Sequence, residues 1–179
     1  DHERFKAFFG HMLEAGVHII NDISGGNLDP GMMSLVGSYG QVPYLLMHMQ
    51  GRPQTMQDNP QYQDIVDDIY RYFIGKVRQA REAGIKDLVL DPGFGFGKTI
   101  GHNFQLLQGL AAFQTLGCPI LVGLSRKSML YKVLGTTPEE TIPQGQVLHD
   151  HALRRGANIL RVHDVLAAKR TVDLFLRMR

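Results

Sequence analysis

Five short, continuously apolar segments recur along the chain, and longer segments with helical periodicity separate them. Each apolar segment has about the length of one strand, and its residues do not alternate between polar and apolar. Continuous apolar runs are typical of parallel strands that are buried on both faces. The alternation of strands and helices therefore predicts an α/β fold with a mainly parallel sheet. The expected strands are residues 17–20, 42–47, 88–90, 120–124 and 159–162.

The segments between the expected strands carry helical patterns. Residues 59–83 show the clearest one, because apolar side chains recur at helical spacing and charged side chains face away from them. Residues 103–116 and 165–179 are also expected to be helical. Residues 137–140 supply a cap residue, a proline and two acids, which are typical of a helix start. No repeat or linker divides the chain, which predicts one domain over residues 1–179.

The composition excludes several classes of protein. Of the 179 residues, 44% are hydrophobic and 20% are charged, which is typical of a soluble globular protein. The net charge of +2 favours neither a nucleic acid nor a membrane surface as partner, and no apolar run approaches the roughly 18 residues of a membrane span. The single cysteine, Cys118, allows no intrachain disulfide and indicates a reducing, cytoplasmic compartment. The chain begins with Asp rather than Met, which leaves open that it is part of a longer protein.

Polar side chains follow each expected strand directly. In parallel α/β folds the ligand binds at the carboxyl ends of the strands. One polar residue at such an end is usually a cap, but five successive strands with polar ends predict a composite binding site. The residues concerned are Asn21, Asp22, His48, Asp91, Ser125, Arg126, Lys127, Ser128, Arg161, His163 and Asp164.

Residues 91–98 are the most informative of these strand ends. An acid and a proline are followed by three alternating glycines, with two phenylalanines between them and a lysine at the end. Glycines allow the backbone to approach a flat or anionic ligand closely. Their spacing matches neither a Walker phosphate loop nor the G-x-G-x-x-G dinucleotide fingerprint. A structural glycine-rich turn is the alternative interpretation.

Asn21 and Asp91 pair an amide with a carboxylate. Their oxygens can accept hydrogen bonds from the N–H and NH₂ groups of a planar heterocycle. The alternative is that Asn21 or Asp22 caps a turn, and that Asp91, directly before Pro92, initiates one.

Cations gather after the fourth and fifth expected strands. Arg126 and Lys127 lie between a strand and a helix, where they can bind an anion at the helix N-terminus or form a solvated basic turn. Arg161 and His163 alternate along the last strand, so they face the same side and suit an anion such as phosphate. These two strand ends therefore predict an anion site.

The remaining histidines are weaker signals. We expect His48, His149 and His151 at the surface. His149 and His151 are two residues apart, so they do not share a helix face and are not expected to bind a metal together. Met47 and its neighbouring methionines are expected to pack rather than to bind a cofactor.

With all five segments together, the chain resembles the dihydropteroate synthases, the pterin-binding enzymes of folate biosynthesis. Five motifs occur in the family's order and spacing, and they cover nearly the whole chain from about residue 16. One of them reads Leu-Asp-Pro-Gly-Phe-Gly-Phe-Gly-Lys. The matching segments are residues 19–26, 46–51, 90–98, 121–128 and 160–165.

The resemblance implies a TIM (β/α)₈ barrel, of which this chain is a partial barrel with strands four to eight. It implies condensation of 6-hydroxymethyl-7,8-dihydropterin pyrophosphate with 4-aminobenzoate to give dihydropteroate and pyrophosphate, the reaction that sulfonamides target. It also implies a cytoplasmic homodimer that uses Mg²⁺. The asparagine that ligates this metal belongs to the family's first strand, so no metal ligand is expected in this chain.

The resemblance assigns roles to residues by position. Asp91, Lys127, Arg161 and His163 match the family's catalytic residues, and Arg161 matches the arginine that stacks on the pterin ring. The expected pterin site is Asn21, Met47, Asp91, Lys127 and Arg161, the pyrophosphate site is Arg161 and His163, and the aminobenzoate site is Phe96 and Ser128.

The chain also departs from the family. The third-strand aspartate that contacts the pterin has no secure counterpart, although Asp1 lies near its place. Residues 143–151 are more polar than the small, apolar helix that the family has there. Two other functions stay open: a pterin-binding fragment without catalysis, and a pterin-dependent methyltransferase domain that passes a methyl group to a corrinoid. Residues 125–128 are not expected in such a methyltransferase.

Overall fold

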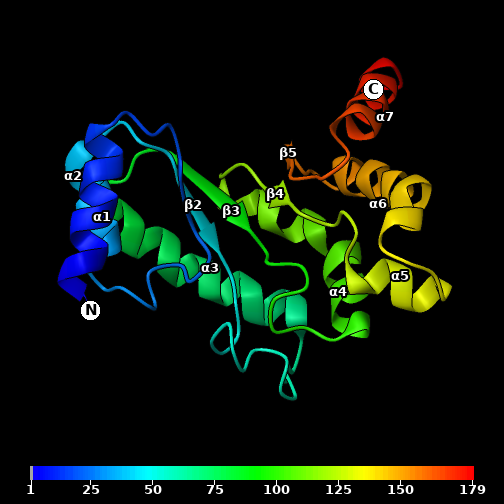
Figure 1. The fold of residues 1–179 in the computed structure, drawn as a ribbon, viewed down its shortest axis with the longest axis horizontal. Helices are drawn as coiled ribbons and strands as arrows, with labels where there is room; N and C mark the ends of the chain where they lie inside the picture. Colours follow the sequence, from blue (N-terminus) through cyan, green and yellow to red (C-terminus); the bar gives the residue numbers. More distant parts are fainter. Residues whose placement is uncertain (1) are drawn as a thin grey trace.

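The computed structural model describes the backbone of residues 2–179 and the side chains of residues 7–179, so Asp1 lies outside the described residues. The five strands of this part run parallel and lie next to one another in chain order (Figure 1). Strands β1, β2 and β3 form one sheet, β4 and β5 form another, and a parallel bridge from Leu90 to Ile120 joins them. The strands are β1 (Ile20–Asp22), β2 (Tyr44–Met47), β3 (Leu88–Asp91), β4 (Leu121–Val122) and β5 (Ile159–Leu160).

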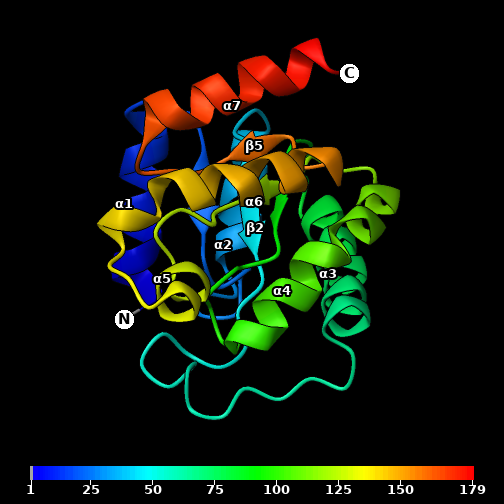
Figure 2. The same ribbon diagram turned by 90° about the vertical axis from the view of Figure 1, so that its right-hand side faces the viewer.

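Helices separate the strands, as an α/β fold requires, and the last two helices pack against each other (Figure 2). No helix in the described part of the chain is both long enough and apolar enough to cross a membrane. The α-helices are α1 (His2–Glu14), α2 (Met32–Tyr39), α3 (Ile65–Glu82), α4 (Ile100–Gln108), α5 (Ser128–Leu134), α6 (Ile142–Arg154) and α7 (Val165–Arg177). The 3₁₀ helices are η1 (Leu110–Leu116) and η2 (Glu139–Thr141).

The helix expected over residues 59–83 begins only at Ile65. Its start is fixed by Asp64, whose carboxylate accepts hydrogen bonds from the N–H groups of Val66 at 2.9 Å and Asp67 at 3.0 Å. An acidic cap of this kind satisfies N–H groups that have no partner within the helix. The apolar pattern extended into the preceding loop because that loop also packs on the core.

Two other helical predictions are modified in detail. The pattern over residues 103–116 corresponds to two elements, since α4 gives way to η1 at Gly109. The start predicted at residues 137–140 is present as η2, where Glu140 accepts a hydrogen bond from the N–H of Thr137 at 3.1 Å. The chain then continues into α6.

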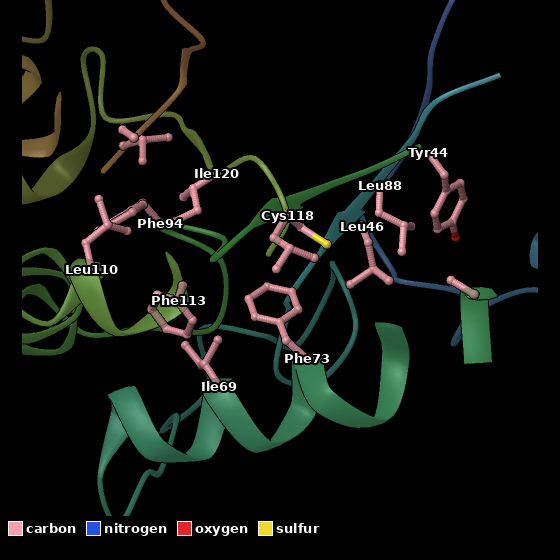
Figure 3. Packing of buried hydrophobic residues seen from close by; sticks show 14 of the residues in the cluster. Tyr44, Leu46, Ile69, Phe73, Leu88, Phe94, Leu110, Phe113, Cys118 and Ile120 are labelled. Carbon is pink, nitrogen blue, oxygen red and sulfur yellow. The ribbon is translucent and has the colours of Figure 1, made fainter. Parts of the chain in front are cut away.

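Apolar side chains between α3 and the sheet form the centre of the core. Ile69 and Phe73 point from α3 toward the strands and are fully buried (Figure 3). The Phe73 ring meets the Phe113 ring edge-on, with centroids 5.8 Å apart. Leu46 of β2 lies on the sheet face that this helix covers. The opposite face of the sheet is therefore the one left for a ligand.

The outer strands are less buried than the sequence predicts. All four residues of β2 are buried, whereas Ile159 in β5 is 39% exposed and Ile19, beside β1, is 50% exposed. An edge strand leaves a row of backbone groups unpaired. Burial on both faces is therefore confirmed for the inner strand β2 but is wrong for β5, which has one neighbouring strand in the described part of the chain.

Candidate active site

Parallel register brings the carboxyl ends of the first three strands together. Asn21 pairs with Leu45, and Met47 pairs with Asp91. Side chains alternate along a strand, so these residues share the sheet face opposite Leu46. The strand ends singled out in the sequence therefore meet on one side of the sheet, away from α3.

Asp91 is almost fully buried, at 1% exposed, and its two carboxylate oxygens face different groups. Oδ1 accepts a hydrogen bond from the N–H of Gly93 at 2.8 Å, which confirms that Asp91 initiates a turn. Oδ2 lies 3.8 Å from a guanidinium nitrogen of Arg161. Burial raises the pKa of the Asp91 carboxyl, and Gly93, Lys127, Arg161 and Lys98 counteract that rise. The turn and a binding role are thus compatible.

Lys127 approaches Asp91 from the residue that precedes α5. Its ammonium donates a hydrogen bond to the carbonyl of Phe94 and lies 5.0 Å from the centre of the Phe96 ring. Burial lowers the pKa of Lys127 to about 8, although the charge of Asp91 raises it and that of Arg161 lowers it. Lys127 and Arg161 therefore both act electrostatically on the same carboxylate.

Arg161 and His163 leave the end of β5 beside β4. A Cβ on Gly123 would lie 3.1 Å from a guanidinium nitrogen of Arg161, so the lack of a side chain at Gly123 leaves room for the arginine. The Arg161 side chain is 48% exposed and hence accessible to a ligand. The N–H of His163 donates to the Ser125 hydroxyl at 3.2 Å, and the ring Nδ1 lies 3.2 Å from the same oxygen.

The side chain of Arg126 contacts other residues than that of Lys127. Its guanidinium pairs with Asp164, at 2.6 Å for the shorter contact, and lies 3.6 Å from Glu139. The hydrogen bond from Arg126 also holds the pKa of Asp164 below its usual range. The structure pairs the charge of Arg126 with Asp164, so the anion site predicted for Arg126 and Lys127 together stays a prediction. Ser128 is half-buried and begins α5.

Asp22 stabilises the turn after β1. Its Oδ1 accepts hydrogen bonds from the N–H and the hydroxyl of Ser24, both at 2.7 Å. Its Oδ2 accepts from the N–H of Gly26 at 2.7 Å and from the Tyr44 hydroxyl. The alternative of a turn cap is therefore confirmed for Asp22. Asn21 is exposed at the same strand end.

Sequence reasoning placed His48 at the surface and gave Lys98 no role. Both are buried, at 7% and 4% exposed, and Lys98 Nζ lies 3.1 Å from His48 Nδ1. The surface prediction is wrong because the glycine-rich loop covers the end of β2. A Cβ on Gly93 would lie 1.9 Å from the His48 carbonyl oxygen. The available signal was a lysine that closes a glycine-rich loop directly after a buried strand.

The surface prediction is also wrong for His149, which is 1% exposed on α6. Its Nδ1 lies 3.2 Å from Gln146 Oε1, while Nε2 has no hydrogen-bond partner among the described residues. Gln146 also accepts from the Thr171 hydroxyl of α7 at 3.0 Å. His151 is half-buried and accepts from Arg155 at 2.7 Å. The polar segment of α6 is thus partly an internal contact with α7.

A cavity of about 400 Å³ lies at the opposite end of the strands. Its lining includes Cys118 and Pro119 before β4 and Asn158 before β5. Residues at the amino ends of barrel strands usually serve stability rather than chemistry. The cluster around Asp91, at the carboxyl ends, is therefore the better candidate for an active site.

Sequence comparison decides the family. A sequence profile described as pterin binding enzyme matches residues 8–163. The chain belongs to this family of pterin-binding enzymes. It is 44% identical over 162 residues to the dihydropteroate synthase of Escherichia coli K12, a match that covers 89% of this chain and 56% of that protein. The chain thus spans about half the length of the curated relatives it matches.

Solved structures agree with this assignment. The chain superimposes on Yersinia pestis dihydropteroate synthase in a sulfonamide complex with a TM-score of 0.92 and 39% identity, and the match covers 97% of this chain and 63% of that one. For Xanthomonas albilineans dihydropteroate synthase with 4-aminobenzoic acid, the TM-score is 0.87 and the identity is 36%. The match covers 97% of this chain and 62% of that one. The resemblance and the partial TIM barrel of strands four to eight are therefore confirmed.

Proposed function

We propose that this chain supplies strands four to eight of a dihydropteroate synthase, which condenses 6-hydroxymethyl-7,8-dihydropterin pyrophosphate with 4-aminobenzoate. The observation that carries the proposal is the buried Asp91 carboxylate, which faces Arg161 and is influenced by the charge of Lys127. A ligand that meets this carboxylate and both cations must offer hydrogen-bond donors and a negative charge. A pterin pyrophosphate offers both. The relatives at 44% and 42% identity carry the synthase name, rather than that of a methyltransferase.

The pterin ring binds on the sheet face that carries Asp91. The Asp91 carboxylate accepts from the ring N–H and the amino group, while Gly93 holds one of its oxygens in place. Asn21 supplies an amide from β1, and Lys127 donates from the opposite side. Met47, fully buried on the same face, supplies apolar contact for the ring.

Arg161 and His163 bind the pyrophosphate. In the reaction, the amine nitrogen of 4-aminobenzoate bonds to the pterin methylene carbon while the bond from that carbon to the pyrophosphate oxygen breaks. The amine loses a proton to water, and negative charge accumulates on the leaving pyrophosphate. Arg161, which also stacks on the pterin, and His163 stabilise that charge. The step needs no protein nucleophile, so it rests on positioning and electrostatics.

The 4-aminobenzoate binds between Phe96 and Ser128. Phe96 is half-buried with its ring beside the Lys127 ammonium, and Ser128 begins α5. An aromatic ring and a hydroxyl at these two positions support a 4-aminobenzoate site beside the proposed pterin site. Because the Xanthomonas albilineans relative was solved with 4-aminobenzoic acid and the Yersinia pestis relative with a sulfonamide drug, we extend both ligands to this site.

Magnesium is implied by the family but does not fit the described residues. In that part of the chain, no group of three His, Cys, Asp or Glu side chains is placed to hold a metal ion. Of the carboxylates near the site, Asp91 is assigned to the pterin, Asp164 is paired with Arg126 and Asp22 holds the turn after β1. No step above therefore passes through a metal.

The proposed assembly is a cytoplasmic homodimer in which residues 1–179 act as one pterin-binding unit. Several apolar side chains are exposed on α7, which packs on α6, and directly after it. Apolar area of this kind favours association when a second copy covers it. The exposed residues are Val165, Leu166, Leu174, Leu176 and Met178.

A pterin binder without catalysis is the second candidate, because the chain spans 56% of the length of its Escherichia coli relative. Calorimetric titration with 6-hydroxymethyl-7,8-dihydropterin tests binding, with Asp91→Asn as the control that should weaken it. Pyrophosphate release in the presence of both substrates and Mg²⁺ tests catalysis. It is measured for the chain alone and for the chain fused to the unmatched part of that relative.

The outcomes separate the candidates. Pyrophosphate release by the fused protein supports the synthase. Pterin binding without release in either protein supports the binder, and a chain that binds no pterin in either form contradicts both.

A further inference from the structure

Lys98 is a buried cation that none of the roles above uses. It is 4% exposed and closes the glycine-rich loop after β3. Its ammonium lies 3.1 Å from His48 Nδ1 and donates to the Phe96 carbonyl at 3.0 Å. A Cβ on Gly93 would lie 3.4 Å from the same nitrogen, so the loop backbone covers the ammonium closely.

Burying an ammonium costs free energy unless hydrogen bonds and opposite charge compensate. Burial lowers the pKa of Lys98 to about 7, while Asp91 of β3 raises it and Lys127 lowers it. Two rings lie near the Lys98 ammonium. The His48 imidazole, directly after β2, contacts it, and the centre of the Tyr62 ring lies 6.0 Å away. Asp91 thus supplies the compensating negative charge in the same site that is proposed to bind the pterin.

His48 is a fixed acceptor for this lysine. Burial and then the charge of Lys98 lower the pKa of His48 to about 2, so its ring is neutral. Below about pH 7, where Lys98 is charged, its ammonium can only donate, so Nδ1 accepts and the imidazole proton lies on Nε2. The His48 ring also meets the Tyr72 ring edge-on, with centroids 4.8 Å apart. The acceptor is therefore held by packing as well.

The geometry points to Lys98 as a positioning residue: its ammonium, anchored on His48, holds the Phe96 carbonyl and sets the glycine-rich loop against Asp91. The inference rests on the proposed function, in which Phe96 contacts the 4-aminobenzoate. Lys98 acts in two ways. It fixes the backbone from which the Phe96 ring projects toward Lys127, and its charge favours the ionised form of Asp91.

Other contacts hold the same loop from the side. Gln57 donates to the carbonyl of Gly95 at 2.6 Å, and Tyr62 donates to that of Gly97 at 2.8 Å. The loop is therefore expected to stay folded when the ammonium is removed, but to lose its fixed position at Phe96. A variant at Lys98 can thus be studied as a folded protein.

The first test uses the ligand-free chain. Lys98→Met removes the charge and keeps the length, and Lys86→Met, at an exposed lysine, is the matched control. Below about pH 7, where the native Lys98 is charged, nuclear magnetic resonance should show that His48 loses its preference for the Nε2–H tautomer in Lys98→Met. Amide exchange at residues 93–97 should become about ten- to hundredfold faster, as for the loss of one hydrogen bond from a charged group, while α3 keeps its protection. An unchanged tautomer and unchanged exchange overturn the proposal.

His48 provides a second pair of variants if Lys98→Met does not fold. His48→Asn retains an acceptor for the ammonium, whereas His48→Leu removes it. We expect the loop amides to stay protected in the first variant and to exchange faster in the second. Equal exchange in the two variants contradicts the anchoring of Lys98 on His48.

Pterin titration separates this inference from the proposed function. Asp91 must be ionised to bind the pterin, so Lys98→Met should move the acidic limb of binding to higher pH, measured from about pH 5 to about pH 9. A native chain that binds no pterin contradicts the proposed function, while the resonance experiment still decides the role of Lys98. Identical affinity and identical pH profiles in native chain and variant show that Lys98 does not serve the site.

Discussion

The guanidinium of Arg161 lies 3.8 Å from the carboxylate of Asp91, and the two side chains differ sharply in exposure, at 48% and 2%. Arg161 leaves the last strand and Asp91 ends the third, so the contact joins the two sheets at their carboxyl ends. An ion pair with one exposed partner adds little stability. Its significance therefore lies in binding: a ligand can meet the arginine from solvent while the carboxylate remains buried.

Asp91→Asn should weaken pterin binding. The substitution replaces an ionised acceptor by a neutral amide, and losing one charge-assisted hydrogen bond costs about 1.5–3 kcal/mol, roughly ten- to hundredfold in affinity. Calorimetry with 6-hydroxymethyl-7,8-dihydropterin measures the loss, and thermal unfolding confirms that the variant is folded. Unchanged affinity would show that Asp91 does not recognise the pterin.

Arg161→Ala and His163→Ala should differ in their ligand dependence. Arg161 is proposed to contact both the ring and the pyrophosphate, so its loss should weaken the pterin and its pyrophosphate ester. His163→Ala should weaken mainly the ester. Titration of each variant with both ligands measures the difference, and Arg170→Ala, at an exposed arginine of α7, is the control. Equal weakening of both ligands by His163→Ala contradicts the assignment.

The sequence predicted the strands and the residues at their ends because two local signals coincide. Apolar runs define buried parallel strands, and polar residues directly after them must lie at the carboxyl edge. Asp91 illustrates this: its strand, its turn and its position beside Lys127 and Arg161 all follow from the order of strands. The family resemblance then supplied the barrel.

Contacts between distant segments could not be predicted in this way. The surface prediction for His48 failed because the loop that covers it comes from beyond β3. Arg126 was grouped with Lys127 because they are adjacent, yet its partner is Asp164 at the start of α7. The exposure of β5 could not be predicted either, because the residues of one strand do not show whether a second strand pairs with it.

Two glycine substitutions should change stability in opposite directions. A Cβ on Gly37 of α2 would lie 1.8 Å from the carbonyl oxygen of Ala83, so Gly37→Ala must displace backbone and should destabilise the fold by about 1–3 kcal/mol. A Cβ on Gly75, inside α3, would meet nothing within 4 Å apart from the adjoining backbone of its own helix, so Gly75→Ala should stabilise by about 0.5–1 kcal/mol. Urea unfolding measures both. A stabilising Gly37→Ala would contradict the close packing of α2 on the end of α3.

Leu174→Glu should disrupt the proposed dimer. Leu174 is 63% exposed on α7, a helix that carries further exposed apolar residues. A buried, unpaired carboxylate opposes association, so light scattering should show a lower mass for the variant. Ile74→Glu, at a residue that is 51% exposed on α3, is the matched control and should leave the mass unchanged. A native chain that is already monomeric at micromolar concentration contradicts the dimer.

Stability should rise with pH between about pH 7 and pH 9, and Lys98 should be a main cause. Burial lowers the pKa of Lys98 from 10.5 to about 7, so above pH 7 the unfolded chain binds this proton and the folded chain does not. A state that binds more protons loses population as pH rises, so the folded form gains up to about 1.4 kcal/mol per pH unit for one proton. Lys127, with its pKa lowered to about 8, adds in the same direction.

Urea unfolding at successive pH values measures this slope. Lys98→Met should flatten it, because the variant has no proton to release at that position, whereas Lys86→Met should keep it. The series stops near pH 9 because burial raises the pKa of Tyr44, and a raised tyrosine pKa makes the folded form bind more protons above about pH 10. That effect lowers stability as pH rises and would mask the contribution of Lys98 to the slope. Equal slopes in Lys98→Met and the native chain would mean that the buried ammonium keeps an ordinary pKa in the folded protein.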